Sequence, residues 1–207
     1  MNWIRISLLT VSFCGLASGA QVVTIISPDG PLPVVVASDK EVPFYGERVK
    51  SHEDAAADLC DYLSRVTGRD IKPGAHDPGA TVMIHVGPDD FVLEHAPDVK
   101  DLYADGFVLR HLTVEGKHHL IVAGIRSQSS RWAVEEFLKQ FAGVRWLFPG
   151  DARYEPVEPA HLQHGVRLLF PGDANYGEIV PSRPTVTIDS GLNQKHEPDY
   201  LHRTNCG

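Results

Sequence analysis

Apolar residues recur at helical spacing in two stretches of the chain, residues 51–68 and residues 129–143. In the first stretch, Ser51 and Asp54 form a capping-box pattern, and Gly68 suits the left-handed residue that often ends a helix. Residues three or four positions apart share one face of a helix, so the apolar ones predict a buried stripe on each helix. The stripes are Ala56, Leu59, Cys60, Leu63 and Val66 in the first stretch, and Ala133, Phe137 and Phe141, flanked by Val134 and Leu138, in the second.

Runs of β-branched and aromatic residues predict strands around these helices. The runs cover residues 21–27, 32–38, 80–87, 106–116, 118–124 and 144–148. The turn sequence PDGP makes the first two runs a strand pair, and the turn around Glu115, Gly116 and Lys117 makes the fourth and fifth a hairpin. The predicted order is therefore ββ-α-β-ββ-α-β. It is typical of an α+β fold, a mixed β-sheet with two main helices packed on one face.

The character of the chain changes after residue 150. Residues 21–150 contain all the periodic stretches and have the length of one ordinary domain. Residues 151–207 are polar and contain several prolines, with short extended pieces and no further long amphipathic helix. We therefore expect this part to be a linker and not part of the core.

A duplication marks the boundary between the two parts. GVRWLFPGDARY at residues 143–154 recurs as GVRLLFPGDANY at residues 165–176, with ten of twelve positions identical. Two copies are too few for a solenoid, which needs about three repeats to bury a shared face. Excising residues 153–174 leaves one continuous passage, which favours a local tandem duplication of 22 residues. We expect copy one to form the last strand of the sheet. Copy two is expected to add an edge strand or to lie loosely on the surface.

The first 20 residues have the layout of a secretory signal peptide. Arg5 precedes the apolar run 6–17, and the small residues Ser18 and Ala20 precede Gln21. This run of twelve residues is too short to span a bilayer as a helix, although a membrane anchor remains the alternative. We expect cleavage near Ala20 and a secreted or periplasmic product.

Charge and cysteine content narrow the possible partners. The 207-residue chain has a net charge of −8 and no block of like charges, which argues against nucleic acid and anionic membrane surfaces as partners. After removal of the signal peptide two cysteines remain, Cys60 and Cys206. Cys60 lies on the buried stripe of the first helix, and nothing in the sequence specifies a disulfide.

The acidic pairs Asp89–Asp90 and Glu135–Glu136 are the candidates for general acid and base. A glycosidase holds two carboxyl groups about 5 Å or more apart across a sugar, whereas side chains adjacent in sequence diverge on a strand or a helix. Glu135 and Glu136 are better explained as the solvent-facing side of the second helix. We therefore assign no catalytic residue in this chain.

Histidines and serines suggest metal or nucleophile chemistry but lack the necessary spacing. The histidines considered are His118, His119, His196 and His202, and the serines are Ser127, Ser129 and Ser130. No HExxH motif, zinc-type cysteine pair, GxSxG motif or phosphate-binding glycine loop accompanies them. We expect surface histidines and helix-capping serines, and neither a metal nor a cofactor.

Three segments resemble a known accessory domain. They are AAADLCDYLSRVTGRDI, DGFVLRHLTVEGKHHLIVAGI and RWAVEEFLKQFAGVRWLFPG, in this order. Together they resemble the N-terminal accessory domain (β-hexosaminidase domain 2-like) of bacterial β-hexosaminidases and α-glucuronidases. The chain looks most like an uncharacterised family of large secreted bacterial proteins. The resemblance covers about 130 residues, the size of one domain. Ser129, Ser130 and Arg131 stand where that family has a glycine-threonine step.

The resemblance implies a non-catalytic module that supports a (β/α)₈ glycosidase barrel beyond Gly207, in carbohydrate metabolism. In such proteins, segments like 181–188 (PSRPTVTI) and 197–203 (EPDYLHR) lead into the barrel. The strand after the second helix would lie where the accessory domain meets the barrel. The expected interdomain contacts are Arg145, Trp146 and Phe148.

Two other functions remain open. A stand-alone glycan-binding or adaptor protein would present exposed aromatic side chains on a rigid face, such as Trp132 or Tyr154. A small enzyme acting alone would need a pocket with converging ionisable groups.

Overall fold

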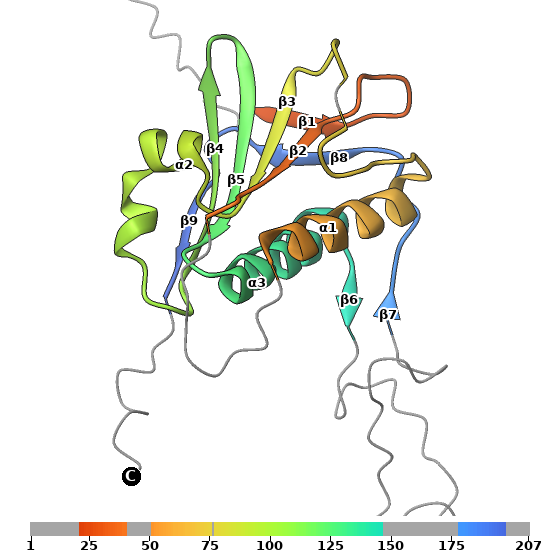
Figure 1. Cartoon of the computed structure of the whole chain (residues 1–207). Helices are drawn as coiled ribbons and strands as arrows, with labels where there is room; N and C mark the ends of the chain where they lie inside the picture. Colours follow the sequence, from red (N-terminus) through yellow and green to blue (C-terminus); the bar gives the residue numbers. More distant parts are fainter. Residues whose placement is uncertain (1–20, 41–50, 76, 147–177, 198–207) are drawn as a thin grey trace, which may run out of the picture.

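The centre of the protein is a mixed five-stranded sheet (Figure 1). The computed structural model describes residues 21–40, 51–75, 77–146 and 178–197. The strands lie in the order β2 (Val34–Ala37), β3 (Val82–Val86), β5 (Lys117–Gly124), β4 (Phe107–Val114) and β9 (Asn193–His196). β2, β3 and β5 are parallel, whereas β4 runs antiparallel to both β5 and β9. The α+β class predicted from the sequence is therefore confirmed.

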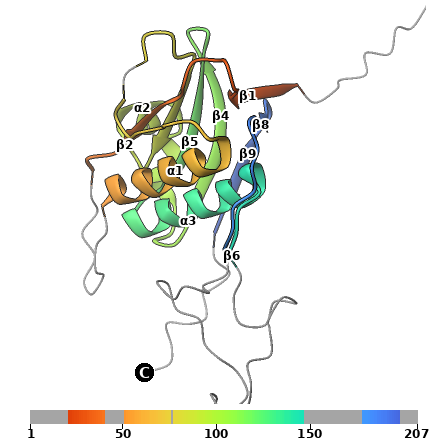
Figure 2. The same cartoon turned by 90° about the vertical axis from the view of Figure 1, so that its right-hand side faces the viewer.

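Two helices cover one face of this sheet, as predicted (Figure 2). They are α1 (His52–Thr67) and α3 (Ser127–Phe137), the latter extended by a π-helical turn, η2 (Leu138–Ala142). The predicted capping box begins α1, because Ser51 Oγ accepts from the Asp54 amide at 3.3 Å and Asp54 Oδ2 accepts from the Ser51 amide at 3.1 Å. Gly68 ends the helix with φ of 74°. The apolar stripe of α1 is fully buried in the main core.

The opposite face carries a smaller layer made of α2 (Asp90–His95) and a 3₁₀ helix, η1 (Pro97–Asp101). Its apolar contacts with the sheet form a second core of seven buried residues, Val92, Ala96, Val99, Leu102, Val108, Ile121 and Ala123. Alternate residues of β4 and β5 thus serve the two cores, since successive side chains on a strand point to opposite faces.

β1 (Val22–Ile26) and β2 do not form the predicted pair. β1 instead pairs antiparallel with β8 (Val186–Asp189), and this ribbon covers the remainder of the face occupied by α1 and α3. The turn after β1 is held by Arg69, whose Nη1 donates to the carbonyls of Ser27 and Gly30, both at 2.7 Å. The PDGP sequence therefore makes a turn, as predicted, but one that carries the chain away from β1 and not back along it.

The prediction of a linker is wrong for residues 178–197, which belong to the folded domain. This segment forms β7 (Glu178–Ile179), β8 and β9. In β8, Val186 and Ile188 are buried and alternate with exposed residues, which is the pattern of a half-buried strand. Prolines near the segment and its short length concealed this alternation.

Copy one of the duplication does not add a strand to the central sheet, contrary to our expectation. Its β6 (Arg145–Trp146) pairs antiparallel with β7 in a separate two-stranded ladder. Phe148, the connection 147–177 and copy two lie outside the described residues.

Replacing Ile188 with alanine tests whether β8 belongs to the domain. Ile188 is 2% exposed in the main core, so we expect the free energy of unfolding to fall by about 2–4 kcal/mol. Its neighbour Thr187 is exposed, and Thr187→Ala should change stability by less than about 0.5 kcal/mol. Urea denaturation of both variants makes the comparison, and equally small effects would support a linker.

Deleting residues 153–174 tests the duplication. The deletion shortens the β6–β7 connection from 31 residues to nine while leaving both paired strands intact. Because the entropy of loop closure varies with the logarithm of loop length, we expect stability to be unchanged or raised by up to about 1 kcal/mol. A loss above about 2 kcal/mol in urea denaturation would show that the removed residues are part of the folded structure.

Candidate functional site

Trp146, one of the expected interdomain contacts, packs against α1 within the domain. Its Nε1–H donates to Tyr62 Oη at 3.1 Å, and the two rings meet edge to face with centroids 5.5 Å apart. The Arg65 guanidinium lies 4.9 Å from the centroid of the Tyr62 ring. Arg145 on the same strand is exposed. Trp146 therefore fixes the β6–β7 ladder to the helix layer, whatever else it contacts.

A buried polar cluster lies between the sheet and α2. His85 near the end of β3 and His119 on β5 share the sheet face opposite α1 and α3. His85 Nε2 lies 3.0 Å from His119 Nδ1, and His85 Nδ1 lies 2.6 Å from Asp89 Oδ2. Asp89 also caps α2, since its Oδ1 accepts from the Val92 amide at 2.8 Å. Three elements are thus joined by one hydrogen-bonded chain, which we call the His–Asp cluster (Asp89, His85, His119).

Aromatic rings stack on the two histidines of this cluster. Phe91 on α2 stacks on His85 and on His119, with ring centroids 4.5 and 4.1 Å apart. His95 stacks on the Phe91 ring at 4.2 Å. His119 is only 6% exposed, so the expectation of a surface histidine is wrong at this position.

The environment of the cluster sets its protonation. Burial, together with smaller electrostatic effects of His85, His95 and Lys117, lowers the pKa of His119 to about 4, against the opposing effect of Asp89. Burial alone would raise the pKa of Asp89, but hydrogen bonds from His85 and the Val92 amide hold it below its usual value. At neutral pH His119 is therefore uncharged and Asp89 ionised. The arrangement can hold and exchange protons.

A second histidine pair lies on the opposite sheet face. His111 Nε2 on β4 lies 3.0 Å from His118 Nδ1 on β5, and His111 Nδ1 lies 2.9 Å from the Ser190 carbonyl. Ser190 directly follows β8, so this pair ties the tail to the hairpin. His196 stacks on Phe107 with ring centroids 4.6 Å apart, and His202 lies outside the described residues.

The acidic pairs do not converge on a shared space. Asp89 belongs to the His–Asp cluster, whereas Asp90 pairs with Lys40. On α3, Glu135 pairs with Arg131 and Glu136 pairs with Lys139, the latter at 3.4 Å. Burial raises the pKa of Glu135, an effect that Arg131 opposes. Each carboxylate is thus held by its own partner.

The serines before and within the first turn of α3 have structural partners. Ser129 Oγ accepts from the Arg126 amide at 3.1 Å. Ser130 Oγ accepts from the Gly124 amide at 3.0 Å and donates to the Gly124 carbonyl at 3.1 Å. The capping role expected from the sequence is thus confirmed at Ser129, whereas Ser130 instead ties the start of α3 to Gly124 at the end of β5.

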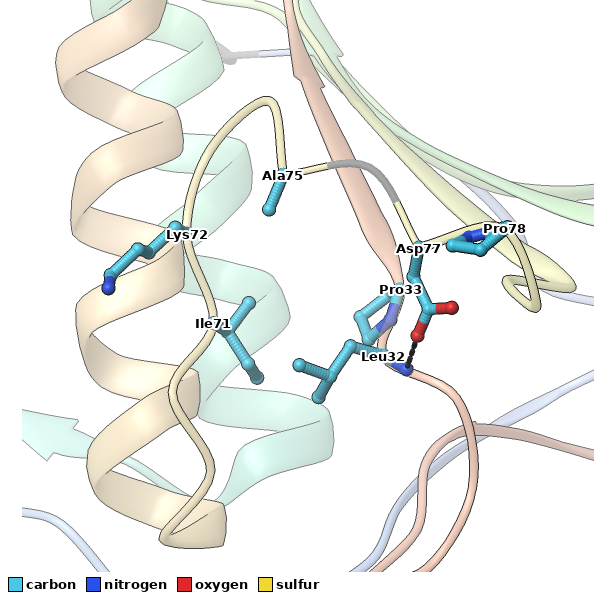
Figure 3. A pocket seen from close by; sticks show the side chains of 7 residues that line it. All are labelled: Leu32, Pro33, Ile71, Lys72, Ala75, Asp77 and Pro78. Atoms are coloured by element: carbon cyan, nitrogen blue, oxygen red, sulfur yellow. Dashed lines mark hydrogen bonds between the residues drawn. The ribbon is translucent and has the colours of Figure 1, made fainter.

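A cavity of about 270 Å³ lies beside the end of α1 (Figure 3). Its lining residues are Leu32, Pro33, Ile71, Lys72, Ala75, Asp77 and Pro78. Asp77 uses both carboxylate oxygens on the chain itself, accepting from the amides of Leu32 at 3.1 Å and Gly79 at 2.9 Å. Lys72 pairs with Asp70 at 2.8 Å and points away from the other lining side chains. The cavity is therefore mainly apolar, with its carboxylate engaged in loop structure.

Further chemistry is limited within the described part of the chain. No group of three or more His, Cys, Asp or Glu among the described residues is placed to hold a metal ion. Burial raises the pKa of the Cys60 thiol to about 12, so it stays protonated and unreactive in the core. Trp132 is partly buried on α3, and Tyr154 lies outside the described residues. None of the described helices combines the length and apolar character needed to cross a membrane.

Comparison with known proteins adds no identification. No protein-family model matches this chain, and no curated protein matches it. The function therefore has to be argued from the fold and from the residues described above.

Trp146→Ala tests the structural role of this side chain in the chain itself. Because Trp146 is half-buried and bonded to Tyr62, we expect a loss of about 2 kcal/mol in the free energy of unfolding. Arg145→Ala, at the exposed neighbouring position, should cost less than about 0.5 kcal/mol. Urea denaturation measures both, and an unchanged Trp146→Ala stability would mean that this residue serves only a contact outside the domain.

Proposed function

We propose that this chain is a non-catalytic accessory module of a secreted, carbohydrate-active protein. In this proposal it supports a following glycosidase barrel, and the process served is carbohydrate breakdown. The proposal takes the three family-like segments as one unit. In support of it, these segments supply α1, the β4–β5 hairpin and α3, which pack on one another around the main core.

The main observation in support of the proposal is the position of β9. β9 is a full member of the central sheet, with register pairs from Phe107↔His196 to Arg110↔Asn193. The stacking of His196 on Phe107 fixes the last residue of the strand. Residue 197, the last residue that the structure describes, directly follows this strand of the central sheet. A supporting module that passes its chain on from a strand of its own sheet fits this placement.

Two of the three expected interdomain contacts, Arg145 and Trp146, form β6, whereas Phe148 lies outside the described residues. β6 points toward the end at which β9 finishes, as both views show (Figures 1 and 2). A domain joined after residue 197 would therefore lie on the side to which Arg145 and Trp146 belong. We propose export through an N-terminal signal peptide, whose residues 1–20 lie outside the described part.

The test is to sequence the source DNA past codon 207, then compare this chain with the continued protein on a panel of aryl glycosides. We expect an in-frame barrel with paired carboxylates, hydrolysis by the continued protein, and none by this chain alone. Ile188→Ala in the continued protein should lower the melting temperature of that entire protein, because β8 contributes Ile188 to the main core.

Hydrolysis by this chain alone would make it an enzyme and contradict the proposal. A stop codon directly after Gly207 would also contradict it. In that case, binding of this chain to immobilised glycans, compared with Trp132→Ala, would decide whether it is a glycan-binding protein instead.

A further inference from the structure

We propose that the His–Asp cluster is an acid-sensitive latch that holds α2 on the sheet at neutral pH and releases it when the cluster takes up protons. The main core under α1 and α3 stays folded during this release. The inference is independent of the proposed function, since it rests on contacts within the domain.

The connections of Asp89 make the cluster a latch. Asp89 stands at the start of α2, accepts from the Val92 amide of that helix, and binds His85 of the sheet at 2.6 Å. Phe91 lies flat against both histidine rings. The attachment of the first turn of α2 therefore runs through the two histidines.

The hydrogen bond between the rings can hold one proton but not two. The ionised Asp89 accepts from His85 Nδ1–H, which leaves His85 Nε2 to accept from His119 Nδ1–H at 3.0 Å. One added proton can be accommodated if His119 changes tautomer, so that His85 donates and His119 accepts. With both rings protonated, two N–H groups face each other across this distance. The bond is then lost and two positive charges are buried together.

The charged groups around the cluster disfavour the second proton. From β5, Lys117 adds positive charge, and from α2, His95 does the same beyond Phe91. Lys40, after β2, acts on Asp89 and is paired with Asp90. Of the two carboxylates at the start of α2, only Asp89 compensates the histidines directly.

The release is confined to α2 because its other supports are few. α2 has six residues, too short to be stable without packing, and its layer rests on the small second core. The following η1 is held independently, since Arg110 donates to both carboxylate oxygens of Asp98 at 2.8 Å. Arg110 also holds the pKa of Asp98 below its usual value, so this pair persists in mild acid.

The sign of the pH dependence follows from the lowered pKa of His119. The released form binds the proton with an ordinary pKa near 6.5, and the closed form with a pKa of about 4. The closed form therefore loses its advantage as pH falls from about 6.5 to 4. Between pH 6.5 and 4 the equilibrium constant for opening should rise by about 80-fold, and over the full titration by about 300-fold. The lowered pKa of Asp89 acts in the same direction at still lower pH.

Hydrogen exchange followed by mass spectrometry, corrected for the intrinsic effect of pH, tests the latch on the full chain. We expect peptides covering α2 to lose about 80-fold in protection between pH 6.5 and 4, while peptides covering α1 and α3 keep theirs. His119→Asn should remove most of this pH dependence, because asparagine can still donate to His85 but cannot take up a proton.

The second histidine pair provides the matched control. His118→Asn changes the same chemistry on the opposite sheet face, where the two ring nitrogens are also 3.0 Å apart, so it should leave the pH response of α2 unchanged. Loss of protection in α1 and α2 at the same pH, or unchanged protection of α2 down to pH 4, would overturn the proposal. An equal effect of both histidine variants would also overturn it.

A measurement on the unmodified chain covers the case in which His119→Asn fails to fold. Histidine ring resonances can be followed by NMR as pH is lowered, and the ring of His119 should titrate below its ordinary pKa of about 6.5, at the midpoint of α2 release. A His119 titration more than one pH unit away from that midpoint would separate the two events and contradict the latch.

Discussion

The fold depends on strands that reach the central sheet from the far end of the chain. β8 pairs with β1 to complete the cover over one sheet face, and β9 gives β4 its second partner. Val186, Ile188 and Leu192 enter the main core from this tail. The domain is therefore complete only when residues near 196 have joined structure formed near residue 22. Closing such long loops costs conformational entropy before the new contacts can stabilise the pairing. These non-local pairings are therefore expected to form late in folding.

The same closure explains how the chain tolerates a duplication inside its domain. β6 and β7 lie side by side, and the Arg183 amide donates to the Val66 carbonyl at 2.8 Å, so the chain returns to α1 at a fixed place. Trp146 fixes the departing strand to the same helix through Tyr62. The length of the connection then enters stability only through its logarithm. A copy placed between these two fixed points disturbs neither the ladder nor the core.

Local patterns were predictable from the sequence, whereas pairings between distant segments were not. The capping box at Ser51, the left-handed Gly68 and the hairpin turn at Glu115 and Gly116 each depend on neighbouring residues, and all are present. The partner of β1 depends on β8, more than 150 residues away, whose alternation is hidden among prolines. The His–Asp cluster was missed for a related reason. His85 and His119 meet only because β3 and β5 are adjacent and parallel, and no spacing within the chain reveals that register.

The two layers on the sheet differ in what holds them, and Arg110 marks the boundary between them. The layer of α1 and α3 shares an apolar core with the tail strands, and the histidine pair on that side joins two strands, β4 and β5, and not a helix to the sheet. The α2 layer instead joins the sheet partly through ionisable side chains, whose attachment must vary with protonation. On β4, Arg110 binds Asp98 of η1 and also donates from Nε to Asn193 of β9 at 2.7 Å. Release of α2 therefore leaves η1 in place, because Arg110 binds both η1 and β9. The α2 layer can therefore detach while β9, the strand after which a following domain would attach, keeps its register with β4.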